Sequence, residues 1–351
     1  MKNLFKLSED GKTLIKVLSR ILNHITIPSG VEVIGEEAFA HYKVLLSVDI
    51  PDTVTTIEEY AFYGCSSLQS INIPNSVNRI ETSAFFGCKS LQGFIIPDSV
   101  TEIGLRVFED CKALQSIKIS NAITKINWRM FKGCSSLQSV VIPDGVTKIG
   151  QDAFYGCKSL QSIIIPDSVT EIGFCAFEDC KKLQSINLPN SITKVGGLLN
   201  CTSLQSIDIP SSVTKIDDSA FKGCTSLQHI NIPDSVTEIS DEAFSGCTSL
   251  QSIEIPDSVA EIGYLAFENC EMLQSIDIPA SVTTIGYMAF GNCISLKSIH
   301  IYSGVIDSLD IDSDSFKGVD KDKCILYVPA GMKQMYSTHP VFGRFKQIVE
   351  E

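Results

Sequence analysis

The chain has 351 residues, 44% of them hydrophobic, and a formal net charge of −13. This acidity argues against nucleic acid as a partner, since binding to nucleic acid depends on Lys and Arg neutralising phosphates. It also argues against adsorption to anionic membranes, and solubility is its simplest consequence. Since no run of about 18 apolar residues occurs, we expect no membrane insertion.

The first 21 residues precede the repeats that fill the rest of the chain. Two short alternating apolar runs, 5–7 and 14–17, flank Asp10-Gly11, which is a strong hairpin signal. Because the first coil of a solenoid would otherwise expose its core, we interpret 1–21 as an N-terminal hairpin cap. Charges every few residues and the lack of an apolar segment predict no signal peptide. That favours the cytoplasm unless the sequence is a trimmed form.

One leucine-containing stretch recurs thirteen times with a fixed spacing. Every step is 23 residues except the step from 183 to 204, which is 21. A period of this length indicates a solenoid, in which repeats stack on their neighbours. The leucines stand at 22, 45, 68, 91, 114, 137, 160, 183, 204, 227, 250, 273 and 296.

The first half of each repeat, numbered from its leucine, predicts a strand and a turn. Positions 1, 4 and 6 are apolar, as in Leu160, Ile163 and Ile165, and the positions between them are polar or variable. This pattern indicates a strand with one buried face. Position 7 is Pro in eleven of the thirteen repeats, as at Pro166, and it ends the strand at a turn. Positions 10 and 13 are apolar again, which predicts a short extended piece.

The second half carries Ala-Phe at positions 17 and 18, and we expect the phenylalanines to stack into an aromatic spine. In the repeats that begin at Leu45 to Leu273, position 20 is Gly, Asn or Asp, residues that tolerate positive φ. His41 fills this position in the first repeat. We therefore predict one helical or 3-10 turn that ends at a left-handed residue. The fold class is then a strand-dominated α/β repeat solenoid, an arc of about thirteen repeats with parallel strands on its concave face.

Eleven of the thirteen cysteines share position 21 of the repeat. Equivalent residues of stacked repeats lie roughly 5 Å apart and point the same way, which suits a disulfide poorly. Because no C-x-x-C pair or suitably spaced His accompanies them, we predict a buried thiol ladder without metal. Cys175 and Cys324 lie outside the ladder. We interpret both as packing residues, although Cys175 falls at an outward position where an exposed thiol is the alternative.

Two segments depart from the regular pattern. The repeat at 183–203 is two residues short and lacks the spine Phe, so Leu198 or Leu199 must fill that place. A tolerated deletion is the simplest explanation, and a functional defect in twist is the alternative. Residues 319–351 supply a strand, a possible helical turn and apolar cover, and we interpret them as a C-terminal cap. The solenoid then spans 22–318.

The repeat LQSIxIPDSVTxIGxxAFxGCxS resembles the BspA-type, or Treponema-type, leucine-rich repeat over about 22–318. The stretches SEDGKTLIKV and LYVPAGMKQMY resemble the caps of that family. The resemblance implies a right-handed solenoid and a cell-surface or secreted protein involved in adhesion and host-protein binding. It carries over no catalytic residues. The five His are scattered and none forms a recognisable nucleophile arrangement, so we expect no enzyme and no cofactor.

A partner is best sought where the repeats differ at outward positions. Position 5 of the strand is apolar in the middle of the chain and acidic toward its end. A partner is expected to place an apolar segment over 95–164 and a basic one over 208–277, whereas strand propensity alone is the simpler explanation. The candidate contact residues are Ile95, Lys118, Val141, Ile164, Asp208, Asn231, Glu254 and Asp277.

The outward position 15 carries Leu105, Trp128, Phe174, Tyr264 and Tyr287, which can anchor a partner or pack on the adjacent turn. We favour packing. The function that these observations predict is a non-catalytic binding or adhesion module for a protein or peptide, with a host or matrix protein as the expected partner. The alternative is a structural or self-assembling solenoid without a dedicated ligand.

Overall fold

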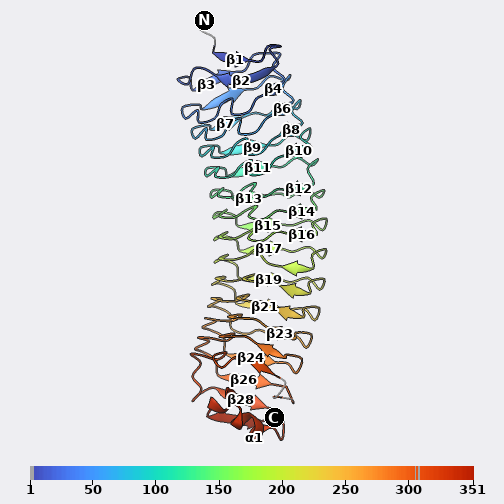
Figure 1. Ribbon diagram of the computed structural model, residues 1–351, viewed down its shortest axis with the longest axis vertical. Helices are drawn as coiled ribbons and strands as arrows, with labels where there is room; N and C mark the ends of the chain where they lie inside the picture. The colour runs from blue at the N-terminus through green and yellow to red at the C-terminus, as the bar shows by residue number, and fades with distance from the viewer. Residues whose placement is uncertain (1–3, 305, 307–308) are drawn as a thin grey trace. The chain divides into compact units, whose positions relative to one another are not determined.

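The structure is a computed structural model that describes residues 4–304, 306 and 309–351. The first three residues of the expected N-terminal cap lie outside this range. The chain divides into an N-terminal unit, Met1–Leu183, and a C-terminal unit, Gln184–Glu351. Each unit is a stack of short coils that contribute strands to parallel ladders (Figure 1).

In the N-terminal unit each coil contributes two strands. An antiparallel hairpin of β1 (Phe5–Leu7) and β2 (Thr13–Val17) precedes the coils, and β2 pairs in parallel with β4. The first strands of the coils are β3 (His24–Thr26), β5 (Ser47–Asp49), β7 (Ser70–Ile71), β9 (Gly93–Ile95), β11 (Ser116–Lys118), β13 (Ser139–Val140) and β15 (Ser162–Ile164). The second strands are β4 (Val33–Ile34), β6 (Thr56–Ile57), β8 (Arg79–Ile80), β10 (Glu102–Ile103), β12 (Lys125–Ile126), β14 (Lys148–Ile149) and β16 (Glu171–Ile172).

The C-terminal unit repeats the two-strand plan. Its first strands are β17 (Ser185–Asn187), β19 (Ser206–Asp208), β21 (His229–Asn231), β24 (Ser275–Ile278), β26 (Ser298–Ile301), β28 (Ile325–Val328) and β29 (Gln347–Glu350). Its second strands are β18 (Lys194–Val195), β20 (Lys215–Ile216), β22 (Glu238–Ile239), β23 (Glu261–Ile262), β25 (Thr284–Ile285) and β27 (Asp310–Ile311). The extended piece expected after the Pro turn is therefore a second strand.

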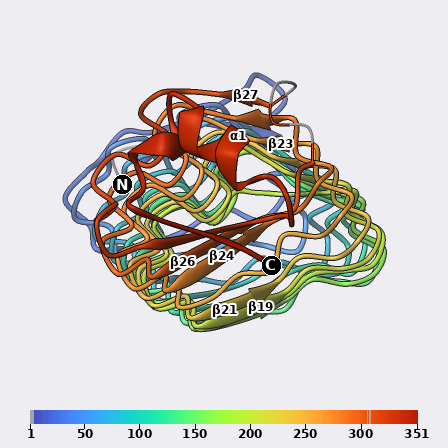
Figure 2. The same cartoon turned by 90° about the horizontal axis from the view of Figure 1, so that it is seen from below.

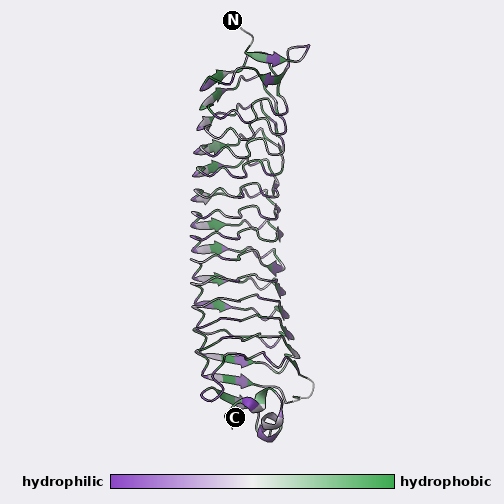
Figure 3. Cartoon of the chain, turned by 60° about the vertical axis from the view of Figure 1, so that its left-hand side comes forward, coloured by the Kyte–Doolittle hydropathy of each residue, from purple (hydrophilic) through white to green (hydrophobic). Residues whose placement is uncertain are grey.

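The pairing register equals the sequence period. Ser116 pairs with Ser139, and Lys148 pairs with Glu171, each 23 residues further along the chain. Equivalent side chains of neighbouring coils therefore stand side by side, about 4.8 Å apart. The strand arrows in Figure 3 change between hydrophilic and hydrophobic along their length. This follows from the alternation of buried and exposed residues, for example in Gly93–Ile95, where only Phe94 is buried.

The segment that carries Ala-Phe forms successive turns and not a continuous helix. The amides at positions 17, 19 and 21 bond to carbonyls three residues earlier, as Cys65 does to Phe62. The amides at 16, 18 and 20 bond instead to the next coil, as Phe62 does to Ala84 at 2.8 Å. The turns are therefore of the expected 3-10 type. Alternate amides bond to the next coil and not within their own, so the turns do not continue as a helix.

Stacked aromatic rings form the core of each unit. In the N-terminal unit the spine runs from Phe39 to Phe177, with most neighbouring ring centroids 4.7–5.4 Å apart. In the C-terminal unit Leu198 takes the place of the first Phe. It is 1% exposed. Its carbonyl accepts a hydrogen bond from the Cys224 thiol, as the carbonyl of a spine Phe does in other coils. Leu199 is only half-buried.

The last coils of the C-terminal unit are covered by the segment after β28. The helix α1 (Lys333–Thr338) and the 3-10 turn η2 (Phe342–Arg344) lie here, and Figure 2 shows α1 across this end of the unit. The buried Tyr336 donates its hydroxyl to the Ser303 carbonyl at 2.8 Å. Phe345 packs edge-on against Phe316, with centroids 5.8 Å apart, so this segment closes the end of the spine.

Candidate functional site

Four candidate residues of the N-terminal unit form one exposed row, which we call the apolar row: Ile95, Lys118, Val141 and Ile164. Lys118 pairs with Ile95, and Val141 bridges to Ile164 in register. The exposed fractions of the three apolar side chains are 61%, 81% and 73% in chain order. Lys118 lies 3.8 Å from Asp98, so its charge is balanced within the unit. The structure therefore brings these four residues together.

The other four candidates belong to the C-terminal unit and form what we call the acidic row: Asp208, Asn231, Glu254 and Asp277. Asp208 pairs in register with Asn231. Glu254 lies in a stretch, 251–256, without assigned strand, yet it is exposed between the buried Ile253 and Ile255. Among the described residues, no cation lies within ion-pair distance of the three carboxylates. The row therefore presents uncompensated negative charge.

The residues at position 15 do not behave alike. Tyr264 stacks on Tyr287 with centroids 5.4 Å apart, and the Arg129 guanidinium lies 4.4 Å from the Trp128 ring centroid. Trp128, Tyr264 and Tyr287 therefore contact side chains of their own or a neighbouring coil, although Tyr264 is still 44% exposed. Phe174 is 64% exposed and makes no ring contact within the described part of the chain, so the packing interpretation is wrong for that residue. The equivalent residue of the preceding coil, Gln151, is not aromatic, so Phe174 has no ring to stack on there.

One rung of the second-strand ladder in the N-terminal unit is open. Within residues 4–183, β10 and β12 are the consecutive second strands that do not pair. At the other rungs an amide at position 14 donates to the previous coil, as Gly150 does to Ile126 at 2.7 Å. Here the Asn127 side chain donates instead, through Nδ2 to the Ile103 carbonyl at 2.7 Å.

The cause of this opening lies in the core. Position 17 is Ala in most coils, but Val107 and Met130 occupy it on the two sides of the open rung, and both are fully buried. Phe94 adds bulk, with its ring edge-on to Phe85 and Phe108 at 5.0 and 4.7 Å. The Phe108 ring centroid is 5.8 Å from that of Phe131 and also 5.8 Å from that of Phe85, so the spine is widened on both sides of Phe108. Close-packed cores accommodate extra volume by local displacement, and here the backbone ladder opens.

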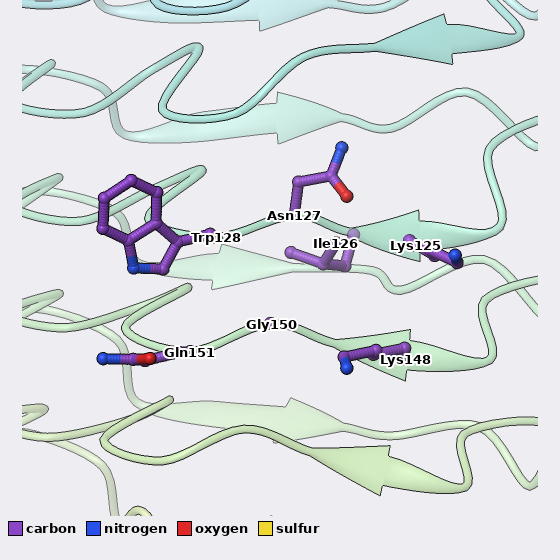
Figure 4. Close-up of a pocket in the computed structure, with 7 residues that line it drawn as sticks. All are labelled: Lys125, Ile126, Asn127, Trp128, Lys148, Gly150 and Gln151. Atoms are coloured by element: carbon purple, nitrogen blue, oxygen red, sulfur yellow. The ribbon is translucent and has the colours of Figure 1, made fainter.

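A groove of about 380 Å³ lies on the coil of β12 and the next coil, that of β14, with which it pairs, and we call it the Trp128 groove. It is lined by Lys125, Asn127, Trp128, Lys148 and Gln151, together with Ile126 and Gly150 (Figure 4). The equivalent corner at Arg79 holds only about 160 Å³. Position 5 of the repeat gives no indication of this groove. The signal for it in the sequence is Asn127 beside the single Trp in one repeat.

The cysteine prediction holds for the ladder, because all eleven thiols at position 21 are buried. Ten of them are seen to donate to a spine carbonyl of the preceding coil, as Cys134 does to Phe108 at 3.1 Å. Cys175 is not an exposed thiol. It is 8% exposed, and burial, with a further contribution from Glu178, raises its pKa to about 12. Among the described residues no group of three or more metal-ligating side chains is present.

The ladders, turns and spine together define a strand-dominated leucine-rich-repeat solenoid in each unit. The family model described as the BspA type leucine rich repeat region matches residues 19–138, 124–197 and 197–322. The chain therefore belongs to the BspA-type leucine-rich repeat family. Solenoids of this kind are generally non-catalytic and serve as protein-interaction modules. No curated protein matched the sequence.

Several solved structures resemble the chain along most of its length. A leucine-rich repeat protein from Bacteroides ovatus is 27% identical with a TM-score of 0.77, covering 99% of this chain and 97% of that one. A leucine rich cell surface protein from Faecalibacterium prausnitzii is 34% identical with a TM-score of 0.61, covering 88% and 96%. The pneumococcal vaccine antigen PcpA, at 17% identity and a TM-score of 0.61, shares the fold over 97% and 91%. No helix in the described residues is long and apolar enough to cross a membrane.

Proposed function

We propose that this protein is a non-catalytic binding module that holds a protein or peptide partner on the apolar row. The observation that carries the proposal is the exposure of three β-branched apolar side chains on four adjacent rungs, with 81% at Val141. Contiguous exposed apolar surface on a soluble protein marks interaction sites more often than isolated residues do. Most other coils carry a polar residue at this position, so the scaffold does not require an apolar one.

The acidic row is the second contact that we propose, for a basic segment of a partner. Asp208, Glu254 and Asp277 are exposed and lack cations of their own in the described chain. Charges of this kind govern the association rate and its salt dependence more than the final affinity. A host or matrix protein at the bacterial surface is the partner we favour. Family membership and the resemblance to a cell surface protein support that location.

The test of the apolar row is a triple threonine variant, Ile95→Thr, Val141→Thr and Ile164→Thr. Threonine keeps the branched shape that suits a strand and removes the apolar surface. The full-length protein is tested against immobilised extracellular-matrix and serum proteins, and the triple variant should bind at least about tenfold more weakly, a loss of about 1.4 kcal/mol. Ile294→Thr, at a side chain that is 61% exposed outside the row, is the matched control. Equal binding by the triple variant would refute the proposal.

The acidic row is tested by charge reversal at Asp208, Glu254 and Asp277. The variant should bind the same partner more slowly, and the salt dependence of its association should flatten. An unchanged association rate would remove the row from the proposed contact. Sedimentation across a concentration range tests the alternative function, because a self-assembling solenoid grows larger as its concentration rises.

A further inference from the structure

The Trp128 groove gathers polar groups that the protein itself leaves unused. Asn127 donates its Nδ2 to Ile103, and Figure 4 shows its oxygen turned away from that bond, toward Lys125. Within the described chain, the Lys125 ammonium, the Trp128 ring N–H and the Gln151 amide form no hydrogen bond or ion pair. One cation, one ring donor and two amide groups therefore surround the same small groove.

The charge of the groove is positive in a chain that is strongly acidic overall. Lys125 and Lys148 pair in register on adjacent rungs, and like charges placed this way repel. Glu171 neutralises Lys148 at 2.7 Å, but Lys125 has no such partner among the described residues. At the equivalent corner at Arg79, by contrast, Glu81 and Glu102 lie 3.1 and 3.3 Å from the guanidinium. Lys125 is thus a cation without a counter-ion.

The C-terminal unit contains a matched arrangement that lacks these features. Lys194 pairs in register with Lys215, as Lys125 does with Lys148. There Gly197 stands in the place of Trp128, and Asp217 and Asp218 stand in the places of Gly150 and Gln151. The Asp217 charge interacts with Lys194 and Lys215. A lysine pair alone therefore does not make the groove. The amides and the indole distinguish it.

We propose that the Trp128 groove binds a uronate unit of an acidic polysaccharide. A uronate is a six-membered sugar ring with a carboxylate and several hydroxyls. The carboxylate would pair with Lys125, and the hydroxyls match the donor and acceptor groups of Asn127, Gln151 and the indole N–H. The apolar C–H face of a sugar ring would pack on the part of the half-buried indole that the Arg129 guanidinium leaves exposed. The volume lies at the lower end of the range of about 300–1,000 Å³ for small-ligand sites.

The sugar fits the groove better than an acidic peptide does. A peptide carboxylate would engage Lys125, but a peptide has no hydroxyl-bearing ring to pack on the indole while bonding to its N–H, the Asn127 oxygen and the Gln151 amide. A neutral sugar would use those groups and leave the cation unpaired. Only a ligand that combines a carboxylate with a hydroxyl-bearing ring satisfies all of them. This site shares no residue with the apolar row. A negative result for the sugar would therefore not contradict the proposed protein-binding function, and the reverse also holds.

The single Trp makes the test direct, because the fluorescence of the whole chain reports from this groove. The full-length protein is titrated with trigalacturonate, with maltotriose as the neutral sugar and triglutamate as the acidic peptide. We expect a saturable fluorescence change with trigalacturonate alone, half-complete at about 1 mM or below. Raising the salt concentration should weaken this binding because the pair at Lys125 is exposed.

Two matched variants locate the site. Lys125→Met should weaken trigalacturonate binding by at least about tenfold, since it removes the charge-assisted contact. Lys194→Met removes an equivalent exposed lysine of the C-terminal unit and should leave the titration unchanged. The proposal is overturned if trigalacturonate gives no saturable change or if maltotriose or triglutamate gives the same response. It is also overturned if both lysine variants behave alike.

Discussion

Two positions of each repeat adopt positive φ, and only one of them is visible in the sequence. Position 20 carries Gly, Asn or Asp after the first repeat, because its residues stack closely on one another. A Cβ added at Gly133 would lie 2.6 Å from the Asp110 side chain. Position 16 also has φ near 55°, yet it holds Arg106, Leu265 and Met288 among others. Its amide bonds to the next coil, as Leu265 does to Tyr287 at 3.0 Å, and this bond holds the strained backbone.

The strain at position 16 predicts the effect of replacing Leu265, whose φ is 54°. Asn tolerates the left-handed region better than other non-Gly residues, and β-branched residues tolerate it worst. Leu265→Asn should therefore raise the free energy of unfolding by about 0.5–1 kcal/mol, and Leu265→Val should lower it by a similar amount. Chemical denaturation of the three proteins measures this order. A Val variant as stable as the Asn variant would contradict the account of strain.

The thiol ladder predicts cysteines that are unreactive in the folded protein. Burial raises the pKa of Cys65 and Cys224 to about 12, and reactivity requires the thiolate. We expect no rapid reaction with a thiol reagent at pH 8, and reaction of all thirteen cysteines after denaturation. Rapid labelling of the native protein would contradict the burial of the ladder.

The same pKa shift has a consequence for stability. Unfolded thiols ionise near 9.0, whereas folded ones keep their protons until about pH 12, so the folded state binds more protons in between. Stability should therefore fall as the pH rises from about 9 toward 12. Measuring the denaturation midpoint across this range checks the sign.

At the scale of elements, the repeat period determined most of what could be predicted. The first strands, the Pro turns and the spine follow from apolar positions that are equivalent in every coil, so a single repeat predicts the others. The second strand was expected only as an extended piece, because two residues such as Lys148–Ile149 carry too short an alternation to identify a strand. The sequence predicts one helical or 3-10 turn after the second strand, and the i to i+3 bonds confirm the 3-10 type. Propensity does not show that alternate amides bond to the next coil.

The residues of the apolar and acidic rows could be predicted from the sequence, because position 5 lies between the buried positions 4 and 6 and must therefore point outward. The Trp128 groove could not. It is lined by residues at positions 12 to 15 of two successive coils, so no single column of equivalent positions indicates it. A period shows which residues are equivalent but not which neighbouring side chains together line a groove.

The short repeat shows that the spine can continue without Phe. Leu198 is 1% exposed and occupies the place of the missing ring, so Leu198→Ala should leave a cavity. The expected loss is about 2–5 kcal/mol of unfolding free energy. The half-buried Leu199 is the matched control, and its replacement by Ala should cost less than about 1.5 kcal/mol. Denaturant titration of both variants distinguishes them, and equal losses would mean that Leu198 does not fill the spine.

At the scale of the molecule, a solenoid is stable only if its end coils are covered. At the C-terminal end, the ring centroids of Phe342 and Phe345 lie 6.2 and 5.8 Å from that of Phe316. The strand β29 also pairs with β28 along four residues. Without this cover, a spine ring and the edge of a strand would face water. An exposed edge of this kind pairs readily with another chain.

Removing residues 329–351 should therefore cause self-association and lower the melting temperature. Light scattering after size-exclusion chromatography, at several concentrations, should show the truncated protein growing in mass relative to the full-length chain. Met335→Ser changes an exposed residue of α1 that is 42% accessible and should have neither effect. If the truncated protein kept the mass and melting temperature of the full chain, the segment would not be a cap.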